Sequence, residues 1–303
     1  MKVIDLFSGA GGSTLGFKMA GLEVILAVDI NEVALSSYSA NHPEVETLQA
    51  DIIQLTAKDL PKADIILGST PCAEFSIANI KRTYDMSLTF QFLKIIYEYK
   101  PKYWMLENVP GIAPFLHGVN YNILNVADYG VPQKRRRCIA GKYPLPTPTH
   151  SEHGNQTLDN GNLKPWVKFG EIKHPDGSHP ISKKGIAGML RRANEMGKKG
   201  CSFGLQFIAD NDVLSTLTST EYYGLRGSSM IVWDEGKLRR LSFLECQRAQ
   251  SFPDDYIFKG TQEQRYHQLG NAVPPLLARA IAFAIKKDGE ERRVKYEKLM
   301  DNQ

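Results

Sequence analysis

An alternation of short apolar runs with longer amphipathic runs constrains the fold of this chain more than any other feature. The short runs have the length of strands and lie at residues 3–7, 24–28, 65–67 and 103–106. The longer runs between them have the apolar spacing of helices and lie at residues 15–19, 32–40 and 88–99. Strands that alternate with helices build a parallel sheet with helices on both faces. The sequence therefore predicts an α/β fold with a doubly wound sheet.

The periodicity weakens after residue 142 and returns near residue 237. Pro, Gly, His and Lys are frequent between these points, and "YPLPTPTH" at 143–150 has the composition of a boundary. We therefore expect a separate small domain or a large insertion there. The later segments "LRRLSFLECQRAQSF" and "LLARAIAFAI" have helical periodicity, so we expect helices in both.

Composition limits the classes of protein that this chain can represent. Its 303 residues are 42% apolar, which is enough for a sizeable core, and no run of eighteen apolar residues predicts a membrane span. Four cysteines lie far apart without a CxxC pair, and His150-x-x-His153 has no further ligand nearby, so we expect no metal. Nine basic and three acidic residues lie between Lys164 and Lys199. That excess suits phosphate contacts, although a solvated charged face would give the same pattern.

The first motif, "DLFSGAGG" at residues 5–12, lies between the first predicted strand and helix. Gly9 and Gly11 allow a sharp turn and a close approach of the backbone to a ligand. Asp29 ends the second predicted strand about twenty residues later, where a ribose hydroxyl would be held. No Lys-Ser or Lys-Thr pair follows the glycines, so a nucleoside cofactor without a pyrophosphate is favoured. Phe7 offers a ring face, and Asp51 offers an acceptor for an amino group.

The second motif, "PCAEFS" at residues 71–76, follows the apolar run at 65–67. Open parallel sheets bind ligands at the carboxyl ends of their strands, and Pro71 fixes one backbone torsion just before Cys72. The position favours a nucleophile. An isolated cysteine is more often an inert buried apolar residue, so the interpretation depends on the other motifs.

Two further motifs supply charged side chains. "MLENVPG" places Glu107 at the end of the next apolar strand, where a lone glutamate is usually an ion-pair partner. In "VPQKRRRC", the side chains of Gln133, Arg135 and Arg137 alternate onto one side of an extended segment. Two guanidinium groups on one face can hold an oxygen of a planar substrate and a phosphate, whereas a basic surface loop is the simpler alternative.

Together the motifs resemble those of a known family. In this order and at about these distances, eight segments resemble the successive motifs of the cytosine-5 DNA methyltransferases of bacterial or archaeal type: "DLFSGAGG", "AVDINEVA", "QADI", "PCAEFS", "ENVPG", "DYGVPQKRRR", "RRLSFLECQRAQSFPDDY" and "QLGNAVPP". The resemblance spans almost the whole chain except its middle. It implies a Rossmann-like, S-adenosylmethionine-dependent methyltransferase sheet with a smaller target-recognition domain.

The resemblance also implies a reaction and its catalytic residues. Cys72 would attack carbon 6 of a cytosine that is flipped out of duplex DNA, and carbon 5 would then accept the methyl group of S-adenosyl-L-methionine. Glu107 would contact ring nitrogen 3 and the exocyclic amine. Arg137 would hold the base and its carbonyl group, and Arg135 would support the loop.

For the cofactor, the matched motifs imply the following contacts: Phe7, Gly9, Gly11, Asp29, Ile30, Asp51, Ile52, Asn271 and Ala272. For nucleic acid, the expected contacts are Ser76, Gln133, Lys183, Lys184 and Arg226. We expect residues 1–145 and 271–303 to form the catalytic domain, 146–240 the target-recognition domain and 241–270 a hinge and helical segment. The expected partners are double-stranded DNA and a cognate restriction endonuclease. The expected state is a monomer in the cytoplasm, associated with the nucleoid.

The chain departs from the family pattern in its nucleophile loop. That loop usually reads Pro-Pro-Cys-Gln, whereas Thr70 and Ala73 stand here in place of the first proline and the glutamine. Two other functions stay open at this point: methylation of cytosine in tRNA, and a non-catalytic DNA-binding subunit of the same fold. Retention of Cys72, Glu107 and Arg137 together argues against the non-catalytic subunit.

Overall fold

The structure is a computed structural model and describes residues 1–72, 75, 83–154, 161–174, 180–198, 205–219, 229–234 and 236–301. The chain divides into two compact units. Unit 1 comprises residues 1–124, 137–148 and 273–303, and unit 2 comprises residues 125–136 and 149–272. The boundary between residues 148 and 149 falls inside the predicted "YPLPTPTH" boundary segment. Residues 125–136, which we expected in the catalytic domain, cluster instead with unit 2.

Unit 1 is built on a seven-stranded sheet with the order β3-β2-β1-β4-β5-β8-β6. Its strands are β1 (Lys2–Leu6), β2 (Glu23–Asp29), β3 (Glu46–Gln49), β4 (Ile65–Ser69), β5 (Tyr103–Asn108), β6 (Tyr121–Asn125) and β8 (Arg136–Lys142). Strands β1 to β5 pair in parallel, as the alternation predicts. Strand β8, which lies between β5 and β6 and was not among the predicted strands, pairs with β5 in the antiparallel direction.

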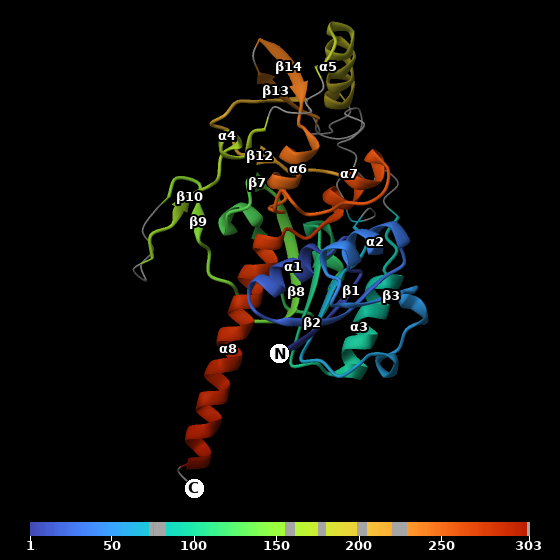
Figure 1. The fold of residues 1–303 in the computed structure, drawn as a ribbon, viewed down its shortest axis with the longest axis vertical. Coiled ribbons are helices and arrows are strands. Elements are labelled where there is room, and N and C mark those ends of the chain that lie inside the picture. The colour runs from blue at the N-terminus through green and yellow to red at the C-terminus, as the bar shows by residue number, and fades with distance from the viewer. Residues whose placement is uncertain are drawn as a thin grey trace. The chain divides into compact units, whose positions relative to one another are not determined.

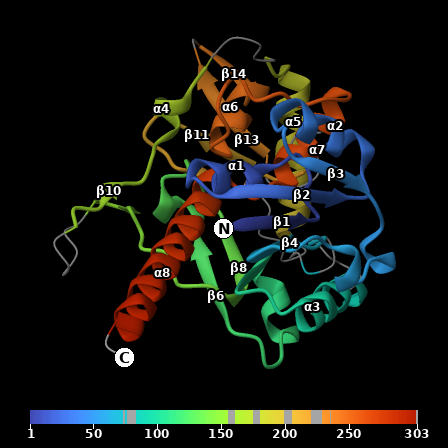
Figure 2. The ribbon, with the colours of Figure 1, turned by 60° about the horizontal axis from the view of Figure 1, so that its bottom comes forward.

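The helices of unit 1 cover both faces of its sheet. They are α1 (Gly12–Met19), α2 (Glu32–Asn41), α3 (Ser87–Tyr99) and α8 (Pro275–Asp301), with short 3-10 helices at Ile52–Gln54, Ala57–Asp59 and Pro110–Phe115. Figure 2 shows α1 and α8 side by side, with α3 across the strands from them. Right-handed crossovers place α1 and α3 on opposite faces of the sheet, because the strand order runs in one direction from β1 to β3 and in the opposite direction from β4 to β5.

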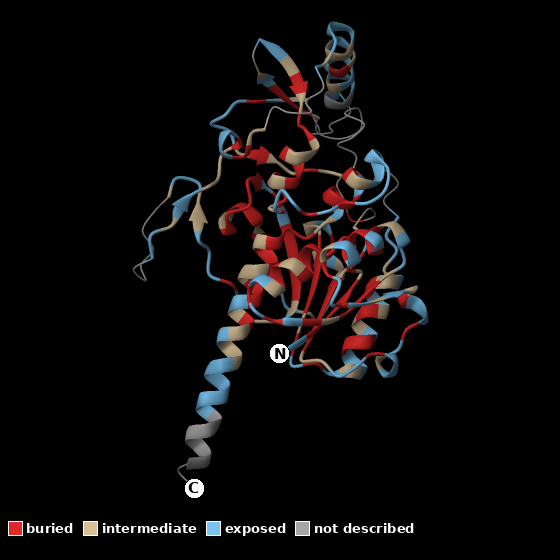
Figure 3. Cartoon of the chain, in the orientation of Figure 1, coloured by how far each residue is buried: buried red, intermediate tan, exposed pale blue. Residues whose placement is uncertain are grey.

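The core of unit 1 lies between its sheet and its helices. Figure 3 shows that buried residues concentrate along the strands. The runs Val3-Ile4 in β1 and Ile65-Ile66-Leu67 in β4 are almost fully buried, as is typical of parallel strands covered on both faces. Gly16 on α1 lies so close to Pro275 and Ala278 of α8 that a Cβ atom there would overlap them. This contact fixes the last helix against the first.

Unit 2 contains short strands and four helices within its described residues (Figure 1). Its strands are β7 (Gln133–Lys134), β9 (His150–Ser151), β10 (Lys164–Pro165), β11 (Leu205–Ile208), β12 (Leu214–Ser215), β13 (Ser229–Asp234) and β14 (Lys237–Arg240). Its helices are α4 (Phe169–Ile172), α5 (Lys183–Lys198), α6 (Phe243–Ala249) and α7 (Gln262–Asn271), with a 3-10 helix at Val126–Tyr129. Strands β11, β13 and β14 form one three-stranded sheet.

The periodicity of the segment "LRRLSFLECQRAQSF" predicts one helix, but the structure has a strand followed by a shorter helix there. The first residues of the segment continue β14, and α6 begins only after Ser242. The hydroxyl of Ser242 accepts the backbone N–H of Glu245, and the Glu245 carboxylate accepts the backbone N–H of Ser242. This capping box fixes the start of the helix. The expected helix in "LLARAIAFAI" is confirmed as part of α8.

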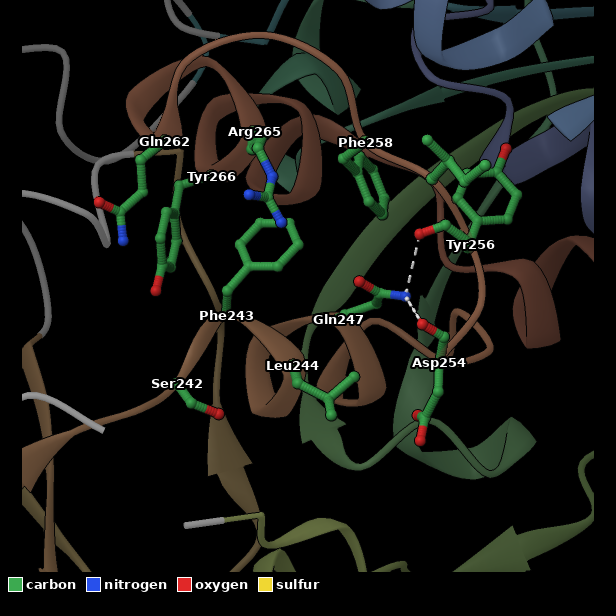
Figure 4. A pocket seen from close by; sticks show the side chains of 11 residues that line it. Ser242, Phe243, Leu244, Gln247, Asp254, Tyr256, Phe258, Gln262, Arg265 and Tyr266 are labelled. Atoms are coloured by element: carbon green, nitrogen blue, oxygen red, sulfur yellow. Dashed lines mark hydrogen bonds between the residues drawn. The ribbon is translucent and has the colours of Figure 1, made fainter. Parts of the chain in front are cut away.

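Aromatic side chains of unit 2 line a pocket of about 520 Å³ (Figure 4). The guanidinium carbon of Arg265 lies 4.1 Å from the ring centroid of Phe243. The amide of Gln247 donates to the carbonyl oxygens of Asp254 and Tyr256, which fixes the loop after α6. No helix within the described residues has both the length and the apolar character needed to cross a bilayer.

Candidate active site

The candidate site lies where the strand order of unit 1 reverses direction. From β1 the chain continues outward through β2 and β3, whereas β4, on the other side of β1, continues outward through β5. Loops that leave adjacent strands in opposite directions open a crevice at the carboxyl ends of those strands. The loops after β1 and β4 carry the motifs "DLFSGAGG" and "PCAEFS" that the sequence analysis singles out.

The loop after β1 has the backbone conformation that its glycines permit. Gly9 and Gly11 have φ values of 53° and 93°, and Phe7 adopts a φ of 58° in spite of its side chain. Apart from Gly9 and its two neighbours in the chain, no described residue has an atom within 4 Å of the position of a Cβ at Gly9, so the backbone is open to a ligand there. The loop therefore has the exposed backbone that a bound nucleoside requires.

Asp29 fixes this loop from the end of β2. One carboxylate oxygen accepts the backbone N–H of Gly9 at 2.7 Å, and the other accepts that of Asn31 at 2.8 Å. Burial raises the pKa of Asp29, and these backbone hydrogen bonds oppose the rise. Each oxygen has a second lone pair, so the carboxylate can also accept a ribose hydroxyl.

A buried polar network lies beneath the glycine loop, and the sequence analysis missed it. Asp5, only 1% exposed, accepts the hydroxyls of Ser13 and Thr14 in the first turn of α1, at 2.9 and 2.8 Å. Thr14 lies 2.7 Å from the hydroxyl of Tyr38. Oδ1 of Asp5 and the hydroxyl of Ser8 are buried without a hydrogen-bond partner among the described residues. The only signal in the sequence is an acidic residue followed eight and nine residues later by Ser and Thr.

The remaining predicted cofactor residues of unit 1 differ in exposure. Ile30 directly follows Asp29 and is 64% exposed, so an apolar surface is available next to the carboxylate. Asp51 uses one oxygen to accept the backbone N–H of Ile53 at 3.0 Å. Ile52 is 3% exposed and packs in the core, so its side chain does not face a ligand.

The loop that carries Cys72 is tied to the cofactor loop. The hydroxyl of Ser69 donates to the carbonyl oxygen of Phe7 at 2.9 Å. Beyond the cysteine, the backbone N–H of Phe75 donates to the carbonyl oxygen of Cys72 at 3.1 Å. Phe75 is buried, and its carbonyl oxygen presses against Gly111. Cys72 therefore lies between two residues with fixed positions, Ser69 and Phe75.

Glu107 and Arg137 form a buried ion pair near the carboxyl ends of β4 and β5. Glu107 lies beside Ser69 in the register of β4 and β5. Because β8 runs antiparallel to β5, its first residues reach this edge, and Nε of Arg137 lies 2.8 Å from Oε1 of Glu107. Both side chains are 8% exposed. The glutamate thus has an arginine partner in addition to the apolar surroundings that the sequence predicts.

Among the described cysteines, Cys72 alone is partly exposed. Cys138 and Cys246 are 1% and 0% exposed, and Cys201 lies outside the described residues. Burial, followed by the nearby charge of Glu107, raises the pKa of Cys138 to about 12. A thiol with that pKa stays protonated at neutral pH and is a poor nucleophile.

The side chains of "QKRRR" alternate between two faces, as predicted. The residues of the buried face are divided between the two units. Gln133, Arg135 and Arg137 are buried, whereas Lys134 and Arg136 are exposed. Gln133 is 0% exposed, and its amide bonds to Ala249, Gln250 and Leu217. That burial gives Gln133 a structural position within unit 2, away from solvent.

Arg135 also bonds inside unit 2. Its guanidinium donates to the carbonyl oxygens of Leu217 and Gly270, at 2.7 and 2.8 Å. Asn271 ends α7 in the same unit and is exposed, with its amide 3.3 Å from the ring of His267. Ala272 follows it, half-buried. These residues belong to unit 2, whereas the other predicted cofactor and catalytic residues belong to unit 1.

The predicted nucleic-acid contacts are described only in part. Lys183 and Lys184 are exposed at the start of α5. Arg191, Arg192 and Lys198 extend the exposed basic surface along the same helix. Ser76 and Arg226 lie outside the described residues.

The fold and site define a class of protein. A doubly wound sheet with a glycine loop after its first strand and a carboxylate at the end of its second is that of the Rossmann-like proteins that bind a nucleoside cofactor.

Comparison with known proteins narrows the class. The family described as "C-5 cytosine-specific DNA methylase" matches residues 1–287. The type II methyltransferase M1.HphI of Haemophilus parahaemolyticus is 32% identical over 95% of this chain and 87% of its own. M.NlaX of Neisseria lactamica is 30% identical over 94% of this chain and 96% of its own.

Two solved structures share the fold. A mutant of DNMT2 from Spodoptera frugiperda aligns with a TM-score of 0.65 and 22% identity over 93% of this chain and 99% of its own. The Dnmt2 methyltransferase of S. pombe aligns with a TM-score of 0.64 and 18% identity over 95% of this chain and 98% of its own.

This chain belongs to the C-5 cytosine-specific DNA methylase family. It is a DNA (cytosine-5-)-methyltransferase that uses S-adenosyl-L-methionine and acts on double-stranded DNA.

Proposed function

We propose that Cys72 is the nucleophile of this methyltransferase and that Glu107 and Arg137 bind the target cytosine. One observation carries the proposal. The hydrogen bond from Ser69 to Phe7 joins the end of β4 to the loop after β1, and Glu107, the ion-pair partner of Arg137, lies beside Ser69 in the sheet. A partly exposed thiol, a carboxylate and a guanidinium thus come from neighbouring strand ends within unit 1.

The reaction needs a nucleophile because carbon 5 of cytosine reacts poorly with a methyl donor. The Cys72 thiolate forms a bond to carbon 6, and the electrons of the 5,6 double bond become available at carbon 5. When bound, S-adenosyl-L-methionine supplies the methyl group that carbon 5 takes. A proton then leaves carbon 5, the bond between Sγ and carbon 6 breaks, and the double bond returns.

Glu107 and Arg137 stabilise the base while Cys72 is attached to it. The carboxyl group of Glu107 faces ring nitrogen 3 and the exocyclic amine, and the Arg137 guanidinium binds the ring carbonyl. In a buried site these hydrogen bonds are stronger than in water, because solvent does not compete. They also help to offset the few kcal/mol that flipping a base out of the duplex costs.

The cofactor is held by residues of the β1, β2 and β3 loops. The open backbone at Gly9 and the Asp29 carboxylate suit a nucleoside, and the exposed Ile30 suits the face of an adenine ring. Phe7, Gly11 and Asp51 complete the set in unit 1. Ile52, Asn271 and Ala272 have indirect roles in this scheme, through packing and through the segment that enters α8.

Unit 2 recognises the target DNA, and Arg135 stabilises the segment that leads to Arg137. The exposed lysines and arginines of α5 suit the phosphate backbone. Curated relatives are named type II methyltransferases, which favours a cognate restriction endonuclease as the partner of this chain in the host.

The experiment that tests the proposal measures transfer of a labelled methyl group to duplex DNA and, in parallel, to tRNA. We expect wild-type protein to label DNA in preference to tRNA. Cys72→Ser should lower the rate by roughly 1,000-fold or more, because a serine hydroxyl is far less nucleophilic than a thiolate at neutral pH. Its affinity for S-adenosyl-L-methionine should stay unchanged, which controls for folding.

Wild-type turnover by Cys72→Ser would remove Cys72 from the mechanism. Preferential labelling of tRNA would favour the alternative substrate. Bisulfite sequencing of the treated DNA would give the recognised sequence in the same experiment.

A further inference from the structure

Thr70 lies two residues before Cys72 and is 4% exposed. The side-chain amide of Asn108 donates to both its carbonyl oxygen, at 3.1 Å, and its hydroxyl oxygen, at 3.0 Å. Asn108 directly follows Glu107 and is 1% exposed. One buried side chain therefore connects the end of β5 to the loop that carries the proposed nucleophile.

The direction of the hydrogen bonds between Asn108 and Thr70 follows from the chemistry of the two groups. An amide NH₂ can only donate, so the hydroxyl oxygen of Thr70 accepts and its own proton is available to another acceptor. The hydroxyl oxygen of Thr89, in the first turn of α3, lies 3.3 Å away. Hydrogen bonds thus connect Asn108 with Thr70 and Thr70 with Thr89, and link β5, the Cys72 loop and α3.

The sequence next to Thr70 gives its side-chain hydrogen bonds added weight. Pro71 has no N–H group, so the residue between Thr70 and Cys72 cannot donate a backbone hydrogen bond. The side-chain oxygen of Asn108 also accepts the backbone N–H of Val109 at 2.7 Å. Hydrogen bonds to its oxygen and from its nitrogen therefore fix the orientation of the Asn108 amide. A fully bonded and buried network of this kind holds one geometry.

We propose that Thr70 is a positioning residue for Cys72, and that its hydroxyl fixes the nucleophile loop relative to Glu107 through Asn108 and to α3 through Thr89. The proposal rests on the assignment of Cys72 as the nucleophile. Its consequence is that the hydroxyl of Thr70 affects the covalent step and leaves cofactor and DNA binding unaffected.

The test compares Thr70→Val, which removes the hydroxyl and keeps the branched shape, with Thr70→Ser, which keeps the hydroxyl. The measurements are kcat, the KM values for DNA and S-adenosyl-L-methionine, and the rate of covalent trapping on duplex DNA that contains 5-fluorodeoxycytidine. We expect Thr70→Val to lower kcat and the trapping rate by about 10-fold with both KM values within about twofold, since misplacing a reacting group lowers the rate of the chemical step. Thr70→Ser should restore both rates.

A double-mutant cycle with Thr89→Val tests the connection to α3. Thr89→Val should lower kcat in the same sense but less, and the double variant should be no slower than Thr70→Val alone, because both changes break one chain of bonds. Additive effects on kcat would overturn the connection. Should Thr70→Val fold poorly, Thr89→Val decides the question alone, because an unchanged kcat in that variant contradicts the proposal.

Cys72→Ser, run in parallel, separates the two assignments. If Cys72→Ser is inactive and Thr70→Val reacts at the wild-type rate, the role of Thr70 is wrong while Cys72 stands. If Cys72→Ser turns over normally, the assignment of the nucleophile is wrong. Equal losses of binding and rate in Thr70→Val that Thr70→Ser does not restore would also contradict a positioning role.

Discussion

At the scale of single residues, the Glu107–Arg137 pair shows how a buried charge is tolerated in this site. Removing a carboxylate and a guanidinium from water is costly, and their mutual contact at 2.8 Å offsets part of that cost. The pairing also fixes both side chains before a base arrives. A base that enters between them would exchange one set of charge-assisted hydrogen bonds for another.

Asp5 is a buried carboxyl group whose ionisation should affect stability. Burial raises its pKa from 3.8 to about 6, with a smaller rise from the charge of Asp29, while the hydroxyls of Thr14 and Ser13 oppose both. Between about pH 4 and 6 the folded state therefore holds a proton that the unfolded state has released. Stability decreases as pH rises through this window, and the full change corresponds to about 3 kcal/mol.

The measurement is the free energy of unfolding of wild type and Asp5→Asn by chemical denaturation at pH 4 and pH 7.5. The asparagine amide cannot ionise, so we expect wild type to lose up to about 3 kcal/mol relative to the variant over this range. Parallel pH profiles for the two proteins would mean that the Asp5 carboxyl group does not carry the raised pKa.

The sequence predicted the reactive and charged side chains of the site better than the side chains that support them. Asp29 and Glu107 stand at the ends of apolar runs and Cys72 stands a few residues after one, so their places near strand ends could be predicted from periodicity alone. The partners of Asp5 and Thr70 could not, because Thr14, Asn108 and Thr89 reach them through side-chain geometry that leaves no periodic signal. The burial of Gln133 could not be predicted either. The alternation of side chains along residues 133–137 shows which of them share a face, but it does not show whether that face contacts protein or solvent.

At the scale of elements, the direction of β8 is decisive for the site. An antiparallel strand beside β5 brings its first residues, and with them Arg137, to the edge where β4 and β5 end. A parallel strand would carry its first residues to the opposite edge. The apolar pattern of β8 is the same in either direction, so the sequence could not predict this orientation.

Helix α5 supports a prediction about DNA binding. Lys183 and Lys184 are exposed at its start, and a lysine that contacts a phosphate releases a counterion when DNA binds. The double substitution of both lysines by alanine should weaken binding to DNA of any sequence. It should also reduce the slope of log K against log salt concentration by about 0.9 for each phosphate that a lysine no longer neutralises.

The matched control is the double substitution of Lys58 and Lys62 by alanine, because both are exposed in unit 1 and the change removes the same charge. We expect that control to leave the slope nearly unchanged. An unchanged slope in the α5 variant, or equal changes in both, would contradict contact between α5 and phosphate.

At the scale of the whole molecule, the chain separates its tasks between two units. Unit 1 holds the glycine loop, Asp29, Cys72 and the Glu107–Arg137 pair, and is formed from three separate stretches of chain. The alternation of strands and helices predicted most of that fold, because each βα step buries apolar surface in a regular way. Unit 2 has short strands and irregular connections, so periodicity gave little guidance there beyond α6.

The central claim, that Cys72 joins covalently to the target cytosine, can be tested on the intact protein. Wild-type protein is incubated with S-adenosyl-L-methionine and duplex DNA in which 5-fluorodeoxycytidine replaces deoxycytidine, and the trapped peptide is identified by mass spectrometry. Fluorine at carbon 5 cannot leave as a proton does, so the adduct should persist on the peptide that contains Cys72. An adduct on Cys138, Cys201 or Cys246, or none from protein that methylates ordinary DNA, would contradict the account.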